Sequence, residues 1–280
     1  MRHLTEATGE NTIIAMATGC MEVVSTPFPE SSWGVSWIHD VFANAAGVAS
    51  GIEAAYRAFD EKDDETYLDH DDVNFVVTAG DGATFDIGIR SLSGMIDRGH
   101  DILYVCYDNE AYMNTGIQRS SATPFGASTT TSPPGEDSLG DDTRKKDMPA
   151  IATAHGCSYV ATASIGYPQD FKEKIRRALT FDGPKYVQVS TPCMLGWDFE
   201  PEKTVTIAKS AVDTGLHPMF EIVDGHLDDI HRLRNRKRVR EYLELQGRFN
   251  HLFESEEGEE VVAELQTYVD ERADELGLDV

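Results

Sequence analysis

The chain has 280 residues and a formal net charge of −25, with 49 Asp and Glu against 24 Lys and Arg. This length is sufficient for one large α/β domain with a complete hydrophobic core. Such a strong negative charge argues against nucleic acid as a partner, because two polyanions repel each other.

The apolar runs and the cysteines exclude two further classes of protein. No run of 18 apolar residues is present, so no transmembrane helix is expected, and residues 1–6 do not resemble a signal peptide. The 4 cysteines are not spaced as a disulfide framework, which favours a reducing compartment. We therefore expect a cytoplasmic protein that is not associated with a membrane. The acid excess and the scarcity of lysine further suggest a salt-rich cytoplasm.

The N-terminal part is expected to contain a strand, a loop and a long helix. Residues 12–17 are apolar and form the expected strand, which ends at Thr18-Gly19-Cys20. Residues 25–36 are rich in Pro, Ser and Trp and are expected to be a loop over the sheet edge. Residues 41–59 carry many alanines and are expected to be a helix, and the acidic residues 60–72 a solvated connector.

The most informative segment lies between residues 73 and 116. The apolar runs 73–78 and 102–106 are expected to be strands, and residues 86–98 a helix between them. Strand, helix and strand in about 30 residues make a βαβ unit, in which the two strands are parallel and adjacent. Asp81 and Asn109 follow these strands, so we expect them side by side at the carboxyl edge of the sheet, where open α/β folds bind ligands.

The chemistry of this pair indicates a metal diphosphate. A carboxylate and an amide oxygen suit a hard cation such as Mg²⁺ or Ca²⁺. Gly80 and Gly82 leave room for a phosphate to approach backbone N–H groups at the N-terminus of the following helix. A tight turn without function is the alternative for Gly80-Asp81-Gly82 alone. The spaced run from Asn109 to Gly116 makes a magnesium diphosphate site the better interpretation.

The rest of the chain is expected to alternate between strands and helices. Residues 115–144 have no hydrophobic period, and so long a segment in a compact domain usually acts as a lid or an interface loop. The expected helices that follow are 148–155 and 170–181, and the expected strands are 159–161 and 186–190.

The C-terminal tail divides by charge. Residues 231–240 are basic and residues 253–280 are acidic. The basic segment is either a solvated face, a contact with an acidic partner, or a partner of the chain's own acidic end.

These motifs resemble the β subunit of pyruvate:ferredoxin oxidoreductase, in the family of 2-oxoacid:ferredoxin oxidoreductases. The resemblance continues in order to about residue 252 and includes several further segments: Thr18-Gly19-Cys20, Ser121 to Pro124, Ser128 to Thr131, Thr191-Pro192-Cys193, Gly196-Trp197, Glu241 to Leu243 and Gln246 to Phe249. It implies an α/β, thiamine-diphosphate-binding fold, with a mostly parallel central sheet and helices on both faces. Residues 1–225 would form the thiamine-diphosphate-binding domain, and residues 226–280 a helical C-terminal extension.

The resemblance also implies the residues of the cofactor site. Mg²⁺ would be held by Asp81, the Asn109 side-chain oxygen and the Ala111 backbone carbonyl. The other residues implied to contact thiamine diphosphate are Thr18, Gly19, Cys20, Gly80, Gly82 and Thr115. Asn114 is implied to face the reacting carbon and is the candidate for substrate contact; a loop-capping amide is the alternative.

Two cysteines are implied to be cluster ligands. From the residues alone, Cys20 and Cys193 are two buried free thiols at the carboxyl edge, and Cys106 and Cys157 are core residues. The resemblance implies that Cys20 and Cys193 provide two of the four ligands of a [4Fe-4S] cluster. In the family, the other two cluster ligands come from a Cys-x-x-Cys motif upstream of the Thr-Gly-Cys segment. This chain contains no Cys-x-x-Cys motif.

Two explanations compete for the missing pair. Either the initiator Met is placed too late in this sequence, which we favour, or the protein is a variant without the cluster. With half of the ligands, the chain alone is expected not to hold a cubane cluster.

The implied activity is the oxidative decarboxylation of a 2-oxo acid, pyruvate first, to acyl-CoA and CO₂, with electrons passed to ferredoxin. The family's activating glutamate belongs to an α-type partner, so we expect this chain to be inactive without it; γ and δ subunits belong to some such complexes. The alternatives are another 2-oxo acid (2-oxoisovalerate or 2-oxoglutarate), a non-redox thiamine-dependent decarboxylase or synthase subunit, and a non-catalytic assembly subunit. Neither zinc-type histidine spacing nor a hydrolase motif is present.

Overall fold

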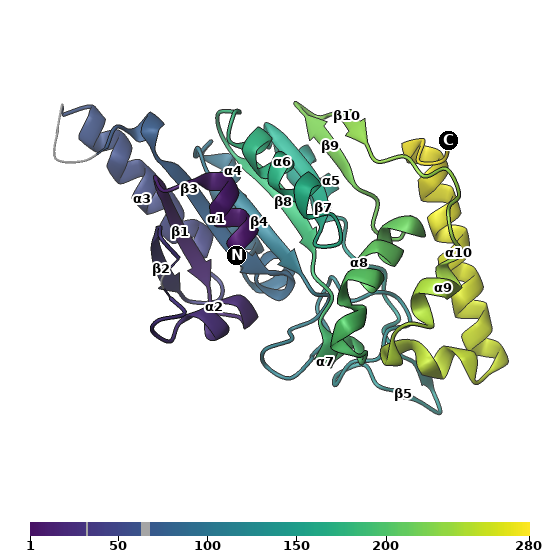
Figure 1. Cartoon of the computed structure of the whole chain (residues 1–280). Coiled ribbons are helices and arrows are strands. Elements are labelled where there is room, and N and C mark those ends of the chain that lie inside the picture. The colour runs from purple at the N-terminus through teal and green to yellow at the C-terminus, as the bar shows by residue number, and fades with distance from the viewer. Residues whose placement is uncertain (32, 63–67) are drawn as a thin grey trace.

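The computed structural model describes residues 1–31, 33–62 and 68–280. Its centre is an eight-stranded sheet in the order β10-β9-β7-β8-β4-β3-β1-β2 (Figure 1). The strands from β2 to β7 in this order are parallel to one another, and β9 and β10 continue the sheet in antiparallel fashion. The expected mostly parallel sheet is therefore confirmed.

The strands are short and mostly buried. The bounds of those in the main sheet are β1 Thr12–Ala17, β2 Ser36–Asp40, β3 Asn74–Gly80, β4 Leu103–Asp108, β7 Tyr159–Ser164, β8 Lys185–Ser190, β9 Phe220–Val223 and β10 His226–Ile230. Strands β4, β7 and β8 are buried at every residue, as expected for central strands of a parallel sheet covered on both faces.

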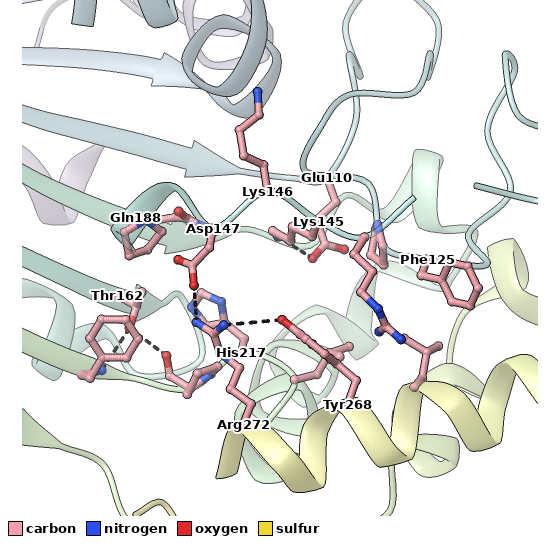
Figure 2. Close-up of a pocket in the computed structure, with 17 residues that line it drawn as sticks. Glu110, Phe125, Lys145, Lys146, Asp147, Thr162, Gln188, His217, Tyr268 and Arg272 are labelled. Carbon is pink, nitrogen blue, oxygen red and sulfur yellow. Dashed lines mark hydrogen bonds and ion pairs between the residues drawn. The ribbon is translucent and has the colours of Figure 1, made fainter. Parts of the chain in front are cut away.

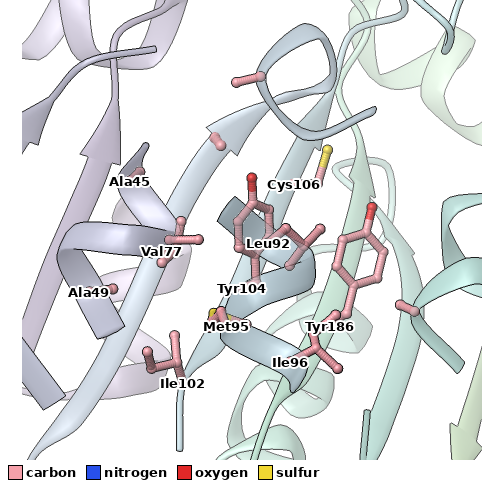
Figure 3. Close-up of a cluster of buried hydrophobic side chains, with 14 of the residues drawn as sticks. Ala45, Ala49, Val77, Leu92, Met95, Ile96, Ile102, Tyr104, Cys106 and Tyr186 are labelled. Carbon is pink, nitrogen blue, oxygen red and sulfur yellow. The ribbon is translucent and has the colours of Figure 1, made fainter. Parts of the chain in front are cut away.

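Helices cover both faces of the sheet, because alternate residues of each strand point to opposite faces. One face packs against α3 (Ala45–Asp60), α4 (Ile89–Asp97) and α5 (Met148–Ala154); Figure 3 shows Val77 and Tyr104 from two strands beside Leu92 and Met95 of α4. The other face packs against α1 (Arg2–Thr8) and α6 (Pro168–Ala178). The small residues Ala45 and Ala49 let α3 approach the sheet closely.

A third buried cluster lies beside the sheet and is built mainly from the C-terminal part of the chain. Its members come from Trp197, α8 (Thr204–Asp213), α9 (Val239–Leu243), the 3₁₀ segment η4 (Gly247–Phe253) and α10 (Glu256–Leu276). The proposed boundary between residues 225 and 226 falls inside the β9–β10 hairpin, so the helical part begins only at α9. The division into two domains stays a prediction.

The basic segment pairs with the acidic end of the same chain. Arg236 forms ion pairs with Asp270 at 2.7 Å and Asp279 at 3.0 Å, and Arg240 pairs with Glu259. Of the three interpretations of this segment, the intramolecular one is confirmed for these arginines. Among the described residues, no helix has the length and apolar character needed to cross a bilayer.

Several expected boundaries were wrong. The expected loop 25–36 is flanked by two elements that the sequence did not predict, the short helix α2 (Cys20–Ser25) and the edge strand β2 (Ser36–Asp40), which take up its first and last residues. The helix expected from residue 41 begins at Ala45, and the one expected from 86 is preceded by a π-helical turn, η2 (Gly82–Ile87).

The two segments expected to be irregular, 60–72 and 115–144, contain short regular elements. The expected connector 60–72 lies partly outside the described residues, and His70–Asp72 form a 3₁₀ turn, η1. Segment 115–144 holds only the hairpin of β5 (Pro134–Gly135) and β6 (Ser138–Leu139), as its lack of periodicity predicts. The remaining short elements are α7 (Met194–Trp197) and η3 (Pro201–Lys203).

Candidate functional site

A cavity of about 200 Å³ lies at the carboxyl ends of β1, β3 and β4. It is lined by every residue that was predicted to contact thiamine diphosphate or substrate: Thr18, Gly19, Cys20, Gly80, Asp81, Gly82, Asn109, Ala111, Asn114 and Thr115. The structure thus brings together residues up to about a hundred positions apart because their strands are parallel neighbours. The roles of these residues in binding stay predictions.

Three oxygen-bearing groups converge at one point of the cavity. A terminal atom of the Asn109 side chain lies 2.9 Å from Asp81 Oδ1 and 3.0 Å from the Ala111 carbonyl oxygen. If that atom is the amide nitrogen, it donates to both oxygens; if it is Oδ1, three oxygens face one another. Neighbouring ligands of a Mg²⁺ ion with bonds of about 2.0–2.1 Å are separated by about 2.9 Å, so the second orientation fits an octahedral metal.

Asp81 is held in place by neutral donors. Ser120 Oγ donates to Asp81 Oδ2 at 2.6 Å, and the backbone N–H of Asn109 donates to Oδ1 at 3.2 Å. Burial, and then the negative charge of Asp108, raise the pKa of Asp81 well above its ordinary value. A buried carboxylate without a cationic partner is the kind of group that a bound metal ion would stabilise in its charged form.

Behind this carboxylate lies a buried cluster of ionised side chains. Lys145 Nζ lies 2.6 Å from Asp108 Oδ2 and 2.9 Å from Glu110 Oε1, and Arg248 Nη2 donates to Glu110 Oε2 at 2.6 Å. Despite burial, the cations Lys145 and Arg248 hold the pKa of Glu110 below its ordinary value. Figure 2 shows Lys145 and Glu110 side by side in the wall of a second, smaller cavity.

The cluster is tied to the turn that carries Asn109. Trp197 Nε1 donates to the Asn109 carbonyl oxygen at 2.8 Å, and the Arg248 guanidinium stacks on the Trp197 ring at 3.9 Å from its centroid. Sequence reasoning did not single out Lys145 as a site residue. The run Arg144-Lys145-Lys146, in a chain with so few lysines, was the available signal.

The glycines of the site are explained by aromatic rings. A Cβ at Gly82 would lie 2.5 Å from the Tyr112 ring, and one at Gly19 would lie 2.5 Å from the Tyr107 hydroxyl. A Cβ at Gly80 would meet the Tyr107 ring at 3.1 Å. These glycines therefore allow two tyrosine rings to line the cavity, whereas the sequence suggested only room for a phosphate.

The two candidate cluster cysteines lie near each other but form no complete ligand set. Burial, followed by the nearby Cys193 thiol and Asp81, raises the pKa of Cys20. Cys193 lies just before α7, and both thiols are partly exposed. No group of three or more His, Cys, Asp or Glu side chains suited to a metal occurs in the described part of the chain. Two thiols do not fit a cubane cluster by themselves.

Comparison with known proteins places the fold. Residues 17–189 match the family of thiamine pyrophosphate (diphosphate) enzymes, C-terminal TPP-binding domain. Pyruvate synthase subunit PorB from Methanothermobacter thermautotrophicus is 53% identical over 268 residues, which cover 96% of this chain and 88% of that protein. PorB from Thermotoga maritima is 44% identical, over 98% of this chain and 83% of that protein.

Related subunits with other substrates are also similar. Ketoisovalerate oxidoreductase subunit VorB from Pyrococcus horikoshii is 41% identical, over 90% of this chain and 80% of that protein. A solved structure of 2-oxoglutarate:ferredoxin oxidoreductase from Magnetococcus marinus superposes with a TM-score of 0.55 at 24% identity, covering 69% of this chain and 58% of that chain. This likeness shows a shared fold.

Proposed function

The chain belongs to the family of pyruvate synthase PorB subunits, and from this premise we propose that it is the thiamine-diphosphate-binding subunit of a pyruvate:ferredoxin oxidoreductase. The reaction is the oxidative decarboxylation of pyruvate to acetyl-CoA and CO₂, with electrons passed to ferredoxin. The observation that carries the proposal is the convergence of Asp81, Asn109 and Ala111 at the carboxyl edge of the sheet. Identity of 53% with a PorB protein against 41% with a VorB protein favours pyruvate over 2-oxoisovalerate.

Each residue of the site has a proposed task. Thiamine diphosphate, when bound, supplies the electron sink that decarboxylation of a 2-oxo acid requires. Asp81, the Asn109 amide oxygen and the Ala111 carbonyl would hold the Mg²⁺ ion that anchors the diphosphate. Asn114 lines the same cavity as Asp81, Asn109 and Cys20, which supports a position facing the substrate. The remaining lining residues, Thr18, Gly19, Gly80, Gly82 and Thr115, would contact the cofactor.

A partner subunit is part of the proposal, because among the described residues that line the cavity, apart from the proposed metal ligand Asp81, none is an obvious general base. Apolar side chains are exposed in the segments that follow the two candidate cluster cysteines: Val24 is 64% exposed, Phe28 85% and Leu195 78%. Exposed apolar groups of this kind mark protein interaction sites. We propose that an α-type subunit covers them and provides the missing acid–base group, with ferredoxin and coenzyme A as further partners.

The cluster is proposed only in part. Cys20 and Cys193 would be two of the four ligands of a [4Fe-4S] cluster, and the other two must come from outside these 280 residues.

The proposal is tested on the complex assembled with its α-type subunit. We expect pyruvate- and coenzyme A-dependent reduction of ferredoxin that requires thiamine diphosphate and Mg²⁺, and a higher kcat/KM for pyruvate than for 2-oxoisovalerate or 2-oxoglutarate. Asp81→Asn should abolish this activity, and Asp97→Asn, at an exposed position at the end of α4, should leave it unchanged. Release of CO₂ without ferredoxin reduction would instead indicate a non-redox enzyme. Activity that survives Asp81→Asn would contradict the proposed site.

A further inference from the structure

Three carboxylates lie buried where β3 and β4 end, and among the described residues two cations form ion pairs with them. Asp81 and Asp108 are each 1% exposed and Glu110 is 9% exposed. The described residues that form ion pairs within this group are Lys145 and Arg248. With all three carboxylates ionised, the cluster would carry one uncompensated negative charge in a region where unpaired charge is costly.

The pairing leaves the residual charge on Asp81. Lys145 bridges Asp108 and Glu110, and Arg248 takes the second oxygen of Glu110. In the described part of the chain, the groups that donate to Asp81 are uncharged: the Ser120 hydroxyl and the Asn109 backbone N–H. Of the three carboxylates, it is the one left free to bind a cation.

Asp108 is the natural competitor for that cation. It precedes Asn109 in the chain, and its charge acts directly on Asp81. Its Oδ2 is occupied by Lys145 at 2.6 Å and by Gln188 Nε2 at 2.7 Å, and its Oδ1 accepts from the Glu110 backbone N–H at 3.2 Å. Without Lys145, the buried Asp108 carboxylate would have no cation beside it, and Asp108 directly precedes the proposed metal ligand Asn109.

We propose that Lys145 is a positioning residue for the metal site: by neutralising Asp108 and joining it to Glu110, it reserves the divalent cation for Asp81, Asn109 and Ala111. Lys145 belongs to the segment after the β5–β6 hairpin, far from the glycine motif in sequence, and its remaining exposed surface faces the second cavity (Figure 2). This inference rests on the proposed magnesium diphosphate site and adds a residue that does not touch the ion.

Loss of such an outer group usually lowers metal affinity by about 10- to 100-fold. We expect Lys145→Met to raise the Mg²⁺ concentration for half-maximal thiamine diphosphate binding by at least about 10-fold. The double variant Lys145→Met/Asp108→Asn removes the lysine together with the carboxylate that it neutralises. It should recover most of the lost affinity, because Asp81 is then again the one buried carboxylate of the cluster without an ion pair. A merely structural lysine would give a double variant as weak as, or weaker than, the single one.

The experiment is a Mg²⁺ titration of thiamine diphosphate binding to the metal-stripped, assembled complex, followed by calorimetry. The arms are wild type, Lys145→Met, the double variant, Asp81→Asn, and Lys146→Met as the control, since Lys146 contacts Asp86 and the Phe85 carbonyl instead. Weaker binding by Lys145→Met with recovery in the double variant supports the inference. The inference is overturned if Lys145→Met needs no more Mg²⁺ than the wild type, or if the double variant does not recover the lost affinity. In either case, the Asp81→Asn arm still tests the proposed magnesium site. If the wild type shows no Mg²⁺-linked binding, both proposals fall.

Discussion

Glu53 of α3 is the buried carboxylate whose contribution to stability is easiest to predict. Its side chain is 0% exposed and accepts hydrogen bonds from Arg57 Nε at 3.1 Å, His100 Nδ1 at 2.6 Å and His70 Nε2 at 3.1 Å. Burial alone would raise the pKa of Glu53. These partners and the Asp101 backbone N–H instead lower this pKa from 4.5 to about 2. One pKa unit is worth about 1.4 kcal/mol, so the native state gains about 3 kcal/mol from ionised Glu53.

The sign of the pH dependence follows from the depressed pKa of Glu53. The contribution of ionised Glu53 to stability is complete above pH 4.5, which is the pKa of this side chain in the unfolded protein. It is lost as the pH falls toward about 2. We expect Glu53→Gln to lower the free energy of unfolding by about 3 kcal/mol at pH 7, which is on the order of 5–10 °C in melting temperature. The difference between the variant and the wild type should narrow below pH 4.5.

The assay is thermal melting of both proteins across pH 3 to 7, followed by circular dichroism. Glu61→Gln is the matched control, because Glu61 follows the same helix and is exposed; a surface change of this kind is worth within about 0.5 kcal/mol. A difference between wild type and Glu53→Gln that is constant over this pH range, or one no larger than that of the control, would refute the reasoning.

Three further predictions concern the site and the charge of the chain. Gly82→Ala should cost about 1–3 kcal/mol of stability, measured by denaturant titration, because the added Cβ would lie 2.5 Å from the Tyr112 ring. Gly51→Ala is the control: Gly51 lies on α3 with open space around it, and its replacement should be neutral or stabilising. Trp197→Phe should cost about 1–3 kcal/mol in the same assay, since it leaves the Asn109 carbonyl without its donor, and an unchanged midpoint would argue against this bond. With a net charge of −25, the melting temperature should rise as KCl is increased toward 1 M, and a fall would count against salt adaptation.

Much of the site was predictable because its signals are local. The motif Gly80-Asp81-Gly82, the spacing to Asn109 and the intervening helical pattern define a βαβ unit, and a βαβ unit has only one common arrangement. For this reason, the prediction that Asp81 and Asn109 are neighbours was confirmed, with an N–H to carboxylate distance of 3.2 Å. The long segment 115–144 was likewise correctly expected to be mostly irregular, although it contains the short β5–β6 hairpin.

Other features were not predictable because they depend on contacts between distant parts of the chain. The edge strands β2 and β10 are mostly exposed and therefore carry little apolar pattern, and β9, between β10 and β7, has only 4 residues. The pairing of Arg236 with Asp270 and Asp279 was one of three open interpretations until the fold brought these residues together.

The sequence by itself determined the fold class, the family and the residues that end the two central strands, because strand periodicity and motif spacing are properties of neighbouring residues. Only the tertiary structure decided which buried charges face one another. Lys145 and Arg248 lie 37 and 138 residues from the carboxylates that they neutralise, Asp108 and Glu110 respectively. Electrostatic balance depends on distance in space, and no local pattern in the chain records it.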